Sequence, residues 1–359
     1  MDLSQRGALW IIAAGVIAAG LYFLREPLTQ FALALILYLA IDGLAETLDK
    51  RIPFTPRWVA LPLAVIIVLG IVSLIGVVVA TNIGAIIGDL GRYEARLNEV
   101  IAQIHYSVGS PGRAATVRDL IAQLQPTRLA AEIGNSLQNL ISAAIFVLIY
   151  LGFLFPAAGV MNEKFDLIFK GEQRAAARDV IARIRISMER YLWVQTLASL
   201  VITALTYITL RIIGLENALF WSFLIFFLNY IPTIGSIVAV VLTTAVALVQ
   251  FPTLGPVAAV AAGVGVWQFV IGNFVQPRMT GDSLNLSSVV VLLALAIWGI
   301  IWGIVGAFLA APMTVMIMIV LAQFPSTKWI AILLSADGKP IPKEDVPKAK
   351  VSKSDSDSN

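Results

Sequence analysis

The segment Asn229-Tyr-Ile-Pro-Thr-Ile-Gly235 interrupts a run that is otherwise apolar from Ala218 to Val249. Pro232 lacks a backbone N–H and its ring clashes with the preceding helical turn, while Gly235 permits non-helical backbone. Backbone groups freed inside hydrocarbon need partners, so irregular backbone at that depth must be buried in protein or line a cavity. The segment therefore predicts a discontinuous helix or a re-entrant hairpin, which is a device that transporters use at substrate and ion sites.

The composition around this break is that of a membrane protein. Of the 359 residues, 59% are hydrophobic and 13% are charged, whereas soluble domains have about 45–50% apolar and about 25% charged residues. An ordinary soluble domain and a disordered chain are both excluded. The net charge of +3 is too balanced to indicate a nucleic-acid partner.

Apolar stretches recur along the whole chain, and a helix of roughly 20 such residues crosses a bilayer. The run Gly7–Leu24 exceeds the apolar core of a signal peptide, which favours a membrane span over a leader. The sequence thus predicts an all-α, polytopic membrane protein. The expected segments are Gly7–Leu24, Leu28–Ile41, Val59–Ala80, Leu140–Met161, Leu192–Ile213, Ala218–Ile231, Ile234–Val249, Leu254–Gly272, Leu286–Ile300 and Gly303–Leu321.

The basic residues of the short loops set the expected orientation, because Lys and Arg concentrate on the cytoplasmic side. They favour a multi-pass protein of the cell (inner) membrane with cytoplasmic N- and C-termini. The predicted organisation is N-terminal membrane segments (1–80), an extracytoplasmic helical hairpin (81–139), a span (140–161), a cytoplasmic basic amphipathic helix (162–191), a C-terminal transport core (192–325) and a cytoplasmic disordered tail (326–359).

The two extramembrane helical parts suggest different partners. The outer hairpin packs against itself or, alternatively, contacts a neighbouring subunit or a gate. The segment 162–191 has one apolar stripe and one basic face. Basic amphipathic helices beside a membrane lie in the anionic headgroup layer, so membrane lipid is the expected partner there.

Several chemistries are excluded by missing residues. The sequence has no phosphate-binding loop for ATP, no potassium-channel filter and no Cys. His105 is the only histidine and falls in the outer hairpin, so no span carries a histidine for catalysis or metal binding. We therefore expect no enzyme activity, no cofactor and no metal site.

A second interruption lies at Trp298-Gly-Ile-Ile-Trp-Gly-Ile-Val-Gly306. Gly299, Gly303 and Gly306 recur at helical spacing, which suits either a close helix–helix contact or the tip of a second hairpin. If both interruptions are hairpins, they enter from opposite sides, as suits alternating access.

Strongly polar residues gather between the two interruptions and at one earlier position. Gln268, Asn273, Gln276 and Arg278 are strongly polar, and Pro277 is expected to end the helix that precedes it. This region is either an ordinary cytoplasmic loop or a functional site, since amides within an apolar segment are costly. Asp42 is either a helix-end residue or a buried acid coupled to proton movement.

The sequence resembles the autoinducer-2 exporter family of bacterial and archaeal membrane proteins. The resemblance covers most of the chain apart from the tail. No single motif is specific to the family, but the order in which the motifs occur together is specific. The matching motifs are Tyr191-x-x-x-Gln195, Gly214-Leu215, Asn229-Tyr-Ile-Pro-Thr-Ile-Gly235, Asn273-x-x-x-Pro277-Arg278-x-x-Gly281, Trp298-Gly299, Trp302-Gly303-x-x-Gly306 and Ala311-Pro312.

The resemblance implies a multi-pass secondary transporter, not driven by an ATPase, with about eight membrane segments. It implies export of a small polar solute such as autoinducer-2 or, alternatively, sodium (lithium)/proton antiport, and it suggests a homo-oligomer. Family members tend to carry an acidic residue near Ile271, and its absence here weakens coupling schemes that would use it. An alternative from another class is a non-transporting scaffold that acts through its outer hairpin.

The candidate translocation site combines helix breakers with polar side chains. Pro232 and Gly235 would break the helix, and the amides would coordinate a small polar solute, a monovalent cation or water. Arg278 would neutralise an anion or gate the site from inside. The candidate residues are Asn229, Pro232, Gly235, Gln268, Asn273, Pro277 and Arg278.

Overall fold

The computed structural model describes residues 3–51, 126–280 and 285–340, with scattered positions between 52 and 125. Every regular element in these residues is a helix, which confirms the all-α prediction. Most of the predicted span Val59–Ala80 and of the outer hairpin lies outside the described residues, as does the predicted tail beyond residue 340. The first part of that tail is described and contains a helix, Lys328–Leu334. The helices are α1 (Leu3–Phe23), α2 (Arg25–Arg51), α5 (Pro126–Ile168), α6 (Glu172–Ile213), α7 (Ala218–Leu228), α8 (Ile234–Gln250), α9 (Leu254–Val270), η1 (Ile271–Val275), α10 (Gln276–Thr280), α11 (Ser288–Leu321) and α12 (Lys328–Leu334).

The length and composition of these helices confirm a polytopic membrane protein. Five described helical stretches are long and apolar enough to cross a membrane, and α7 and α8 are shorter apolar helices. The five are Arg25–Ala45, Ser142–Met161, Gln173–Ile213, Leu254–Met279 and Ser288–Leu321.

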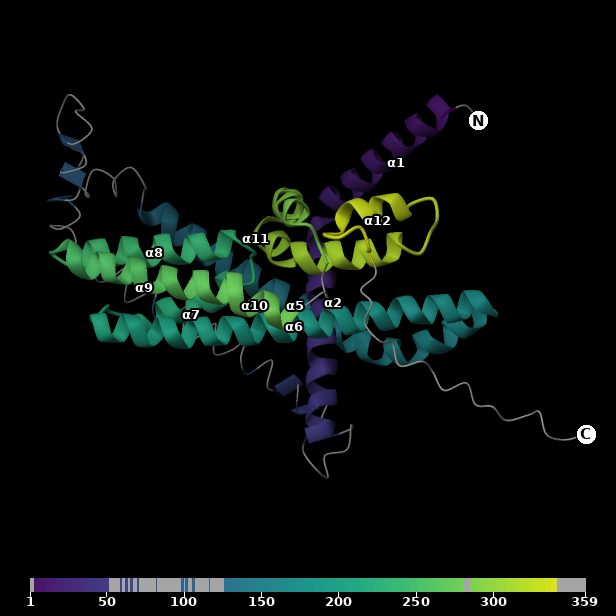
Figure 1. Ribbon diagram of the computed structural model, residues 1–359, viewed down its shortest axis with the longest axis horizontal. Coiled ribbons are helices and arrows are strands. Elements are labelled where there is room, and N and C mark those ends of the chain that lie inside the picture. Colours follow the sequence, from purple (N-terminus) through teal and green to yellow (C-terminus); the bar gives the residue numbers. More distant parts are fainter. Residues whose placement is uncertain are drawn as a thin grey trace, which may run out of the picture.

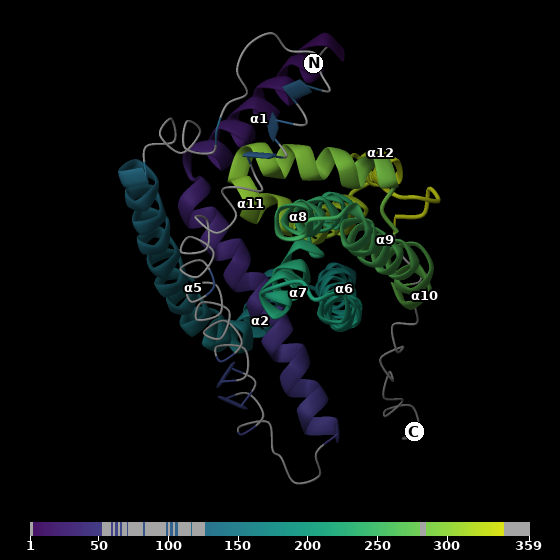
Figure 2. The same ribbon diagram turned by 90° about the vertical axis from the view of Figure 1, so that its left-hand side faces the viewer.

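The helices form two groups that meet at α6. Figure 1 shows α6, α8 and α9 running along the long axis of the molecule with α2 crossing α6, and Figure 2 looks down these helices. One apolar cluster joins α6 to α7, α8 and α9, and another joins α6 to α2 and α11. Helix α6 therefore belongs to both cores.

Helix α2 corrects the prediction of a short segment that ends near Asp42. The helix continues to Arg51, and Asp42 is only 5% exposed in its middle. Arg185 of α6 places its Nη2 2.8 Å from Asp42 Oδ2 and its Nε 2.6 Å from Glu189 Oε1. Because α2 continues past Asp42, the interpretation of this residue as a helix end is wrong, and of the two alternatives only a buried acid fits the structure. The ion pair with Arg185 compensates for the buried charge.

The basic segment 162–191 and the span after it are less separate than the sequence suggests. Its first residues complete α5, and the chain turns at Gly171, where φ is 56°. Helix α6 then runs from Glu172 to Ile213 without a break at residue 191. Continuity follows because neither Pro nor Gly interrupts this stretch.

The first predicted interruption is present between α7 and α8. Ile234 N–H donates to Pro232 O at 2.6 Å, and Thr233 has φ 61° and ψ −55°. This is a γ-turn, a strained backbone for a β-branched residue. Gly235 is itself helical. It is needed because a Cβ there would overlap the carbonyl oxygen of Leu228.

The end of α8 is hydrogen-bonded to the segment just before α7. Gln250 at the end of α8 donates through Nε2 to Gly214 O at 2.9 Å, and its Oε1 accepts from Glu216 N–H at 2.8 Å. Helices α7 and α8 also pack against each other. They therefore form a helical hairpin, called the first hairpin below, whose tip is Asn229–Thr233 and whose base is the Gln250 clasp.

The second predicted interruption is a sharp kink in α11. Gly303 has φ 65° and ψ −144°, a backbone open to glycine alone. Trp298 Nε1 donates to Thr314 Oγ1 at 3.3 Å, a distance impossible along a straight helix, where 16 residues span about 24 Å. Gly306 packs under Trp298, since a Cβ there would overlap the Trp298 carbonyl oxygen. The sequence posed a close helix–helix contact and a second hairpin tip as alternatives, and the structure shows the close contact at Gly306 beside the kink at Gly303.

Candidate functional site

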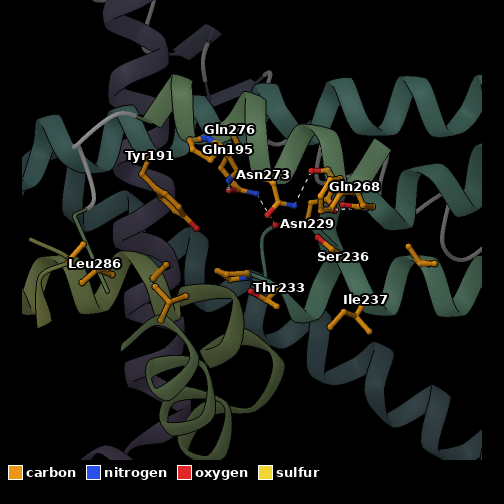
Figure 3. A pocket seen from close by; sticks show the side chains of 18 of the residues that line it. Tyr191, Gln195, Asn229, Thr233, Ser236, Ile237, Gln268, Asn273, Gln276 and Leu286 are labelled. Carbon is orange, nitrogen blue, oxygen red and sulfur yellow. Dashed lines mark hydrogen bonds between the residues drawn. The ribbon is translucent and has the colours of Figure 1, made fainter. Parts of the chain in front are cut away.

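A pocket lies between the tip of the first hairpin, α6 and the end of α9. Its volume is about 870 Å³. Its polar lining comes from α6, from the hairpin tip and the start of α8, from α9 to α10 and from the segment before α11 (Figure 3). None of the described lining residues is acidic or basic. The polar lining residues are Tyr191, Gln195, Asn229, Thr233, Ser236, Gln268, Asn273, Gln276 and Asn285. The chemistry of this pocket is that of amide and hydroxyl dipoles.

Four of these amide residues form one chain of hydrogen bonds, called the amide network below. Gln276 Nε2 donates to Gln195 Oε1 at 2.7 Å, and Gln195 Nε2 donates to Asn229 O at 2.7 Å. Gln268 Nε2 donates to Asn229 Oδ1 at 2.9 Å. The network ties α6, the hairpin tip, α9 and α10 together, and Figure 3 shows the side chains converging.

The amide network leaves hydrogen-bonding capacity unused. Among the described residues, Asn229 Nδ2 and Tyr191 OH are buried polar atoms without a partner. Both residues line the pocket. Buried donors without partners are rare in native structures and require water, an ion or a ligand. These two groups are therefore positioned to bind acceptor atoms of a molecule in the pocket.

The helix that carries Asn273 and Pro277 has an irregular turn at the pocket. Residues Ile271–Val275 form a π-helical turn, in which Gln276 N–H donates to Ile271 O. Pro277 does not end the helix as predicted, because α10 continues to Thr280. Pro277 cannot donate a backbone bond, and the wider turn before it accommodates the ring. Asn273 Nδ2 donates a hydrogen bond to Phe269 O, one turn earlier in the same helix, at 2.9 Å.

A short pair of extended backbone segments, before α11 and after α12, borders the pocket. Leu286 pairs with Ser335 in an antiparallel bridge, and Asn285 O accepts from Ala336 N–H at 2.9 Å. Asn285 Nδ2 donates to Asp337 Oδ1 at 2.7 Å. This hydrogen bond holds the pKa of the exposed Asp337 carboxyl below its usual value. Asn285, Leu286 and Ala336 all line the pocket.

The structure brings most, but not all, of the predicted site residues together. Asn229, Pro232, Gln268, Asn273 and Pro277 line the pocket. Gly235 is not a lining residue and packs closely against the carbonyl oxygen of Leu228 beside the hairpin tip. Arg278 is exposed and is not a lining residue either. Gly303 and Gly306 shape the kink of α11, whereas a Cβ at Gly299 would meet only Ala307 at 4.0 Å.

Sequence reasoning did not place Gln195 or Tyr191 in the site. Gln195 is only 5% exposed on α6 and contacts both Asn229 and Gln276. The signal that could have found it is an amide within the uncharged, mainly apolar stretch Leu192–Leu210, which is the same argument that selected Gln268.

Comparisons with known proteins agree with this architecture. The family described as AI-2E family transporter matches residues 11–326. A putative transport protein of Haemophilus influenzae is 28% identical over 338 residues, which cover 92% of this chain and 96% of the relative. The AI-2 transport protein TqsA of Escherichia coli is 28% identical over 328 residues, covering 89% of this chain and 92% of that protein. A putative transport protein of Borreliella burgdorferi is 31% identical over 201 residues, 56% of each chain.

Proposed function

This chain belongs to the AI-2E transporter family, a family of membrane transport proteins, and we propose that it is a secondary transporter that exports a small polar solute. Autoinducer-2 is the first solute to test, because one relative is an AI-2 transport protein. The observation that carries the proposal is the pair of unpartnered donors, Asn229 Nδ2 and Tyr191 OH, in a pocket of about 870 Å³.

The geometry of the first hairpin supports transport rather than a purely structural role. Helix α7 has 11 residues, about 16 Å, which is too short to cross roughly 30 Å of hydrocarbon. The Gln250 clasp holds both outer ends of the hairpin together. We propose that the hairpin is re-entrant and places its tip within the membrane. Irregular backbone is tolerated at such depth where it lines a cavity.

The lining favours an uncharged solute over the alternative of sodium (lithium)/proton antiport. The described lining residues include no carboxylate that could exchange a proton with a bound cation. A cation would be held by amide and carbonyl oxygens alone. For the same reason the substrate is expected to be selected by hydrogen bonds instead of by charge.

The surroundings of the transporter follow from the loop charges and the resemblance. We propose the inner membrane, both termini in the cytoplasm, lipid contact along the basic part of α6 and a homo-oligomeric assembly. The alternative of a scaffold acting through the outer hairpin predicts that the pocket residues are dispensable.

A flux assay with purified protein in liposomes tests the proposal. Uptake or release of autoinducer-2, sodium and protons is measured under imposed gradients for the wild type, Asn229→Ala and Gln173→Ala. Asn229→Ala removes a donor and the Gln268 acceptor, and a lost bond of about 1.4 kcal/mol reduces flux about tenfold. Gln173 is an exposed amide at the start of α6 and serves as the matched control. Wild-type flux in Asn229→Ala would contradict the assignment, and the absence of any gradient-dependent flux would favour the scaffold.

A further inference from the structure

Helix α12 packs on α11 with one side and leaves another side exposed (Figure 1). Ala331 is 0% exposed and packs with Met318 of α11. Trp329, Ile332 and Leu333 share a different side of the helix, because they are neighbours at spacings of three and four residues. They are 60%, 41% and 67% exposed, and among the described helices α12 contacts only α11. We call these three side chains the outer face of α12.

Helix α12 begins where a long uncharged stretch of the chain ends. Lys328 N–H donates to Phe324 O at 2.9 Å, and Thr327 Oγ1 donates to Leu321 O at 2.9 Å, which fixes α12 to the end of α11. The sequence has no charged residue between Asp282 and Lys328. A charged side chain is costly within hydrocarbon, so the exposed Lys328 marks the level at which the chain reaches the membrane surface.

The composition around the outer face is typical of the boundary between headgroups and acyl chains. Trp329 supplies an amphipathic ring of the kind that is enriched at this depth, and Phe324, 56% exposed just before the helix, adds a second aromatic side chain. Lys328 lies beside the outer face and carries the positive charge that anionic headgroups attract. A lipid surface therefore matches both the apolar and the charged groups of α12.

Protein matches the outer face less well than lipid does. The sequence after Pro340 has Ile341, Val346 and Val351 as its only large apolar residues. A second copy of the chain would gain little hydrophobic energy at this level, because lipid already surrounds apolar side chains there. A helix of seven residues is also marginal in water without packing on its exposed side.

Helix α12 leads directly into the paired extended segments that border the pocket. Ser335 N–H donates to Ala331 O at 3.1 Å, and Ser287 N–H donates to Leu334 O at 3.1 Å. Ser335 is only 6% exposed and forms the antiparallel bridge with Leu286, which lines the pocket. The position of α12 therefore constrains one border of the pocket.

We propose that α12 is an interfacial anchor whose outer face binds phospholipid at the membrane surface. The aromatic and aliphatic side chains enter the headgroup layer, as in other amphipathic helices that lie on a membrane. This attachment holds the paired extended segments in place beside the pocket. The attachment stands on the exposed face and its composition, whereas any effect on a transported solute rests on the proposed function.

The natural absence of Cys from this chain makes the anchor directly testable. Leu333→Cys on the outer face and Ala336→Cys, an exposed position just beyond the helix, are made in the full chain and labelled with a thiol-reactive fluorophore. Each protein is reconstituted in phosphatidylcholine–phosphatidylglycerol vesicles. Fluorescence is quenched with iodide on both sides of the membrane, with lipid that carries a nitroxide near the headgroup, or with lipid that carries it near the end of the acyl chain.

The proposal predicts that the label at Leu333→Cys is quenched most by the shallow nitroxide and is shielded from iodide, whereas iodide quenches the label at Ala336→Cys. Equal quenching by iodide at both positions would place the outer face in water and overturn the proposal. Shielding from iodide without quenching by either lipid would reveal a protein cover, such as a second copy, and would overturn it too. Stronger quenching by the deep nitroxide would contradict an anchor at the surface.

A second measurement tests whether the attachment holds the paired extended segments. A buried thiol at Ser335→Cys reacts with maleimide only when these segments open, so its reaction rate reports their local opening. We expect the double change Trp329→Gln/Leu333→Gln to raise this rate roughly threefold or more. The rate at the exposed Ala336→Cys should stay the same and serves as the control. An unchanged rate at Ser335→Cys would overturn this part of the proposal.

Folding and transport are kept separate from lipid contact. If Leu333→Cys does not give a monodisperse elution profile in detergent, Trp329→Cys replaces it and is judged by the same comparison with Ala336→Cys. Quenching needs no transport, so lipid contact in a protein without gradient-dependent flux supports the anchor and contradicts the proposed function. Flux together with an outer face in water does the reverse.

Discussion

The two interruptions of apolar helix in this protein, at Asn229–Thr233 and at Gly303, differ in what surrounds them. The first brings a strained γ-turn and the amide network to one pocket, and it leaves Asn229 Nδ2 without a partner. The second is surrounded by tryptophan, alanine and glycine, and its polar groups are satisfied, since Trp298 Nε1 donates to Thr314. A broken helix thus lines a pocket in one place and serves packing in the other, and the side chains at the break decide which.

The interruptions also touch each other. The ring of Tyr230 at the first tip stacks on Phe308 of α11, with centroids 4.9 Å apart and planes inclined by 20°. Tyr230 OH is also 2.7 Å from Thr196 Oγ1 of α6. This stack links the tip of the first hairpin to the half of α11 that follows Gly303.

The largest expected effect comes from a change in the amide network at the first interruption. Gln268→Leu removes the donor to Asn229 Oδ1 from a side chain that is 6% exposed. We expect flux to fall at least about tenfold, which corresponds to about 1.4 kcal/mol, with normal insertion. Thr314→Val, the matched change at the second interruption, should keep flux within about twofold. Equal losses in liposome assays would mean that both breaks serve the same role.

The next effect concerns stability at the packing interruption. Gly306→Ala forces a Cβ against the Trp298 carbonyl oxygen, and overpacking of this kind costs about 1–3 kcal/mol. Gly299→Ala, one turn away from the kink, meets only Ala307 and should change stability by less than about 0.5 kcal/mol. Thermal unfolding in detergent measures both, and equal midpoints for the two variants would contradict the close contact.

A smaller effect tests whether the two interruptions are coupled. Tyr230→Leu, Phe308→Leu and the double variant form a thermodynamic cycle in unfolding experiments. A stacked aromatic pair contributes about 0.5–1.5 kcal/mol beyond its buried area, so we expect a coupling energy of that size. Strict additivity of the two single changes would show that the tip and α11 act independently.

The smallest effect sharpens the boundary of the site. Arg278 was selected from the sequence as a neutraliser or gate, but it is exposed and outside the pocket lining. We expect Arg278→Ala to lower flux by less than about threefold, or about 0.6 kcal/mol. A loss as large as that of Gln268→Leu would restore the role proposed for Arg278 from the sequence.

Local signals explain which parts of the structure were predictable. The interruptions at Pro232 and near Gly303 were predicted, because a missing N–H and a missing Cβ act on the residue's own backbone. The role of Gly235 was misread as backbone freedom, whereas it provides room for Leu228 O. The helix end expected at Pro277 was also wrong, since the π-helical turn before it accommodates the ring.

Long-range partners explain what could not be predicted. The sequence allowed Asp42 to be either a helix-end residue or a buried acid, but it gave no sign that Arg185 of α6 would pair with it. Gln195 was outside the candidate site, yet it bonds to Gln276, 81 residues away in the chain. Neither partner can be read from a local pattern, because the helices that carry them meet only after packing.

The sequence by itself determined that this protein is all-α and embedded in a membrane, and where its apolar helices are interrupted. The length of an apolar segment and the presence of helix-breaking residues are local properties of the chain. Their effect on the structure therefore does not depend on which helices pack nearby. Only the tertiary structure decided that one interruption lines a pocket and the other packs under a tryptophan. That outcome depends on which helices lie beside each break, and packing of side chains from distant segments sets it.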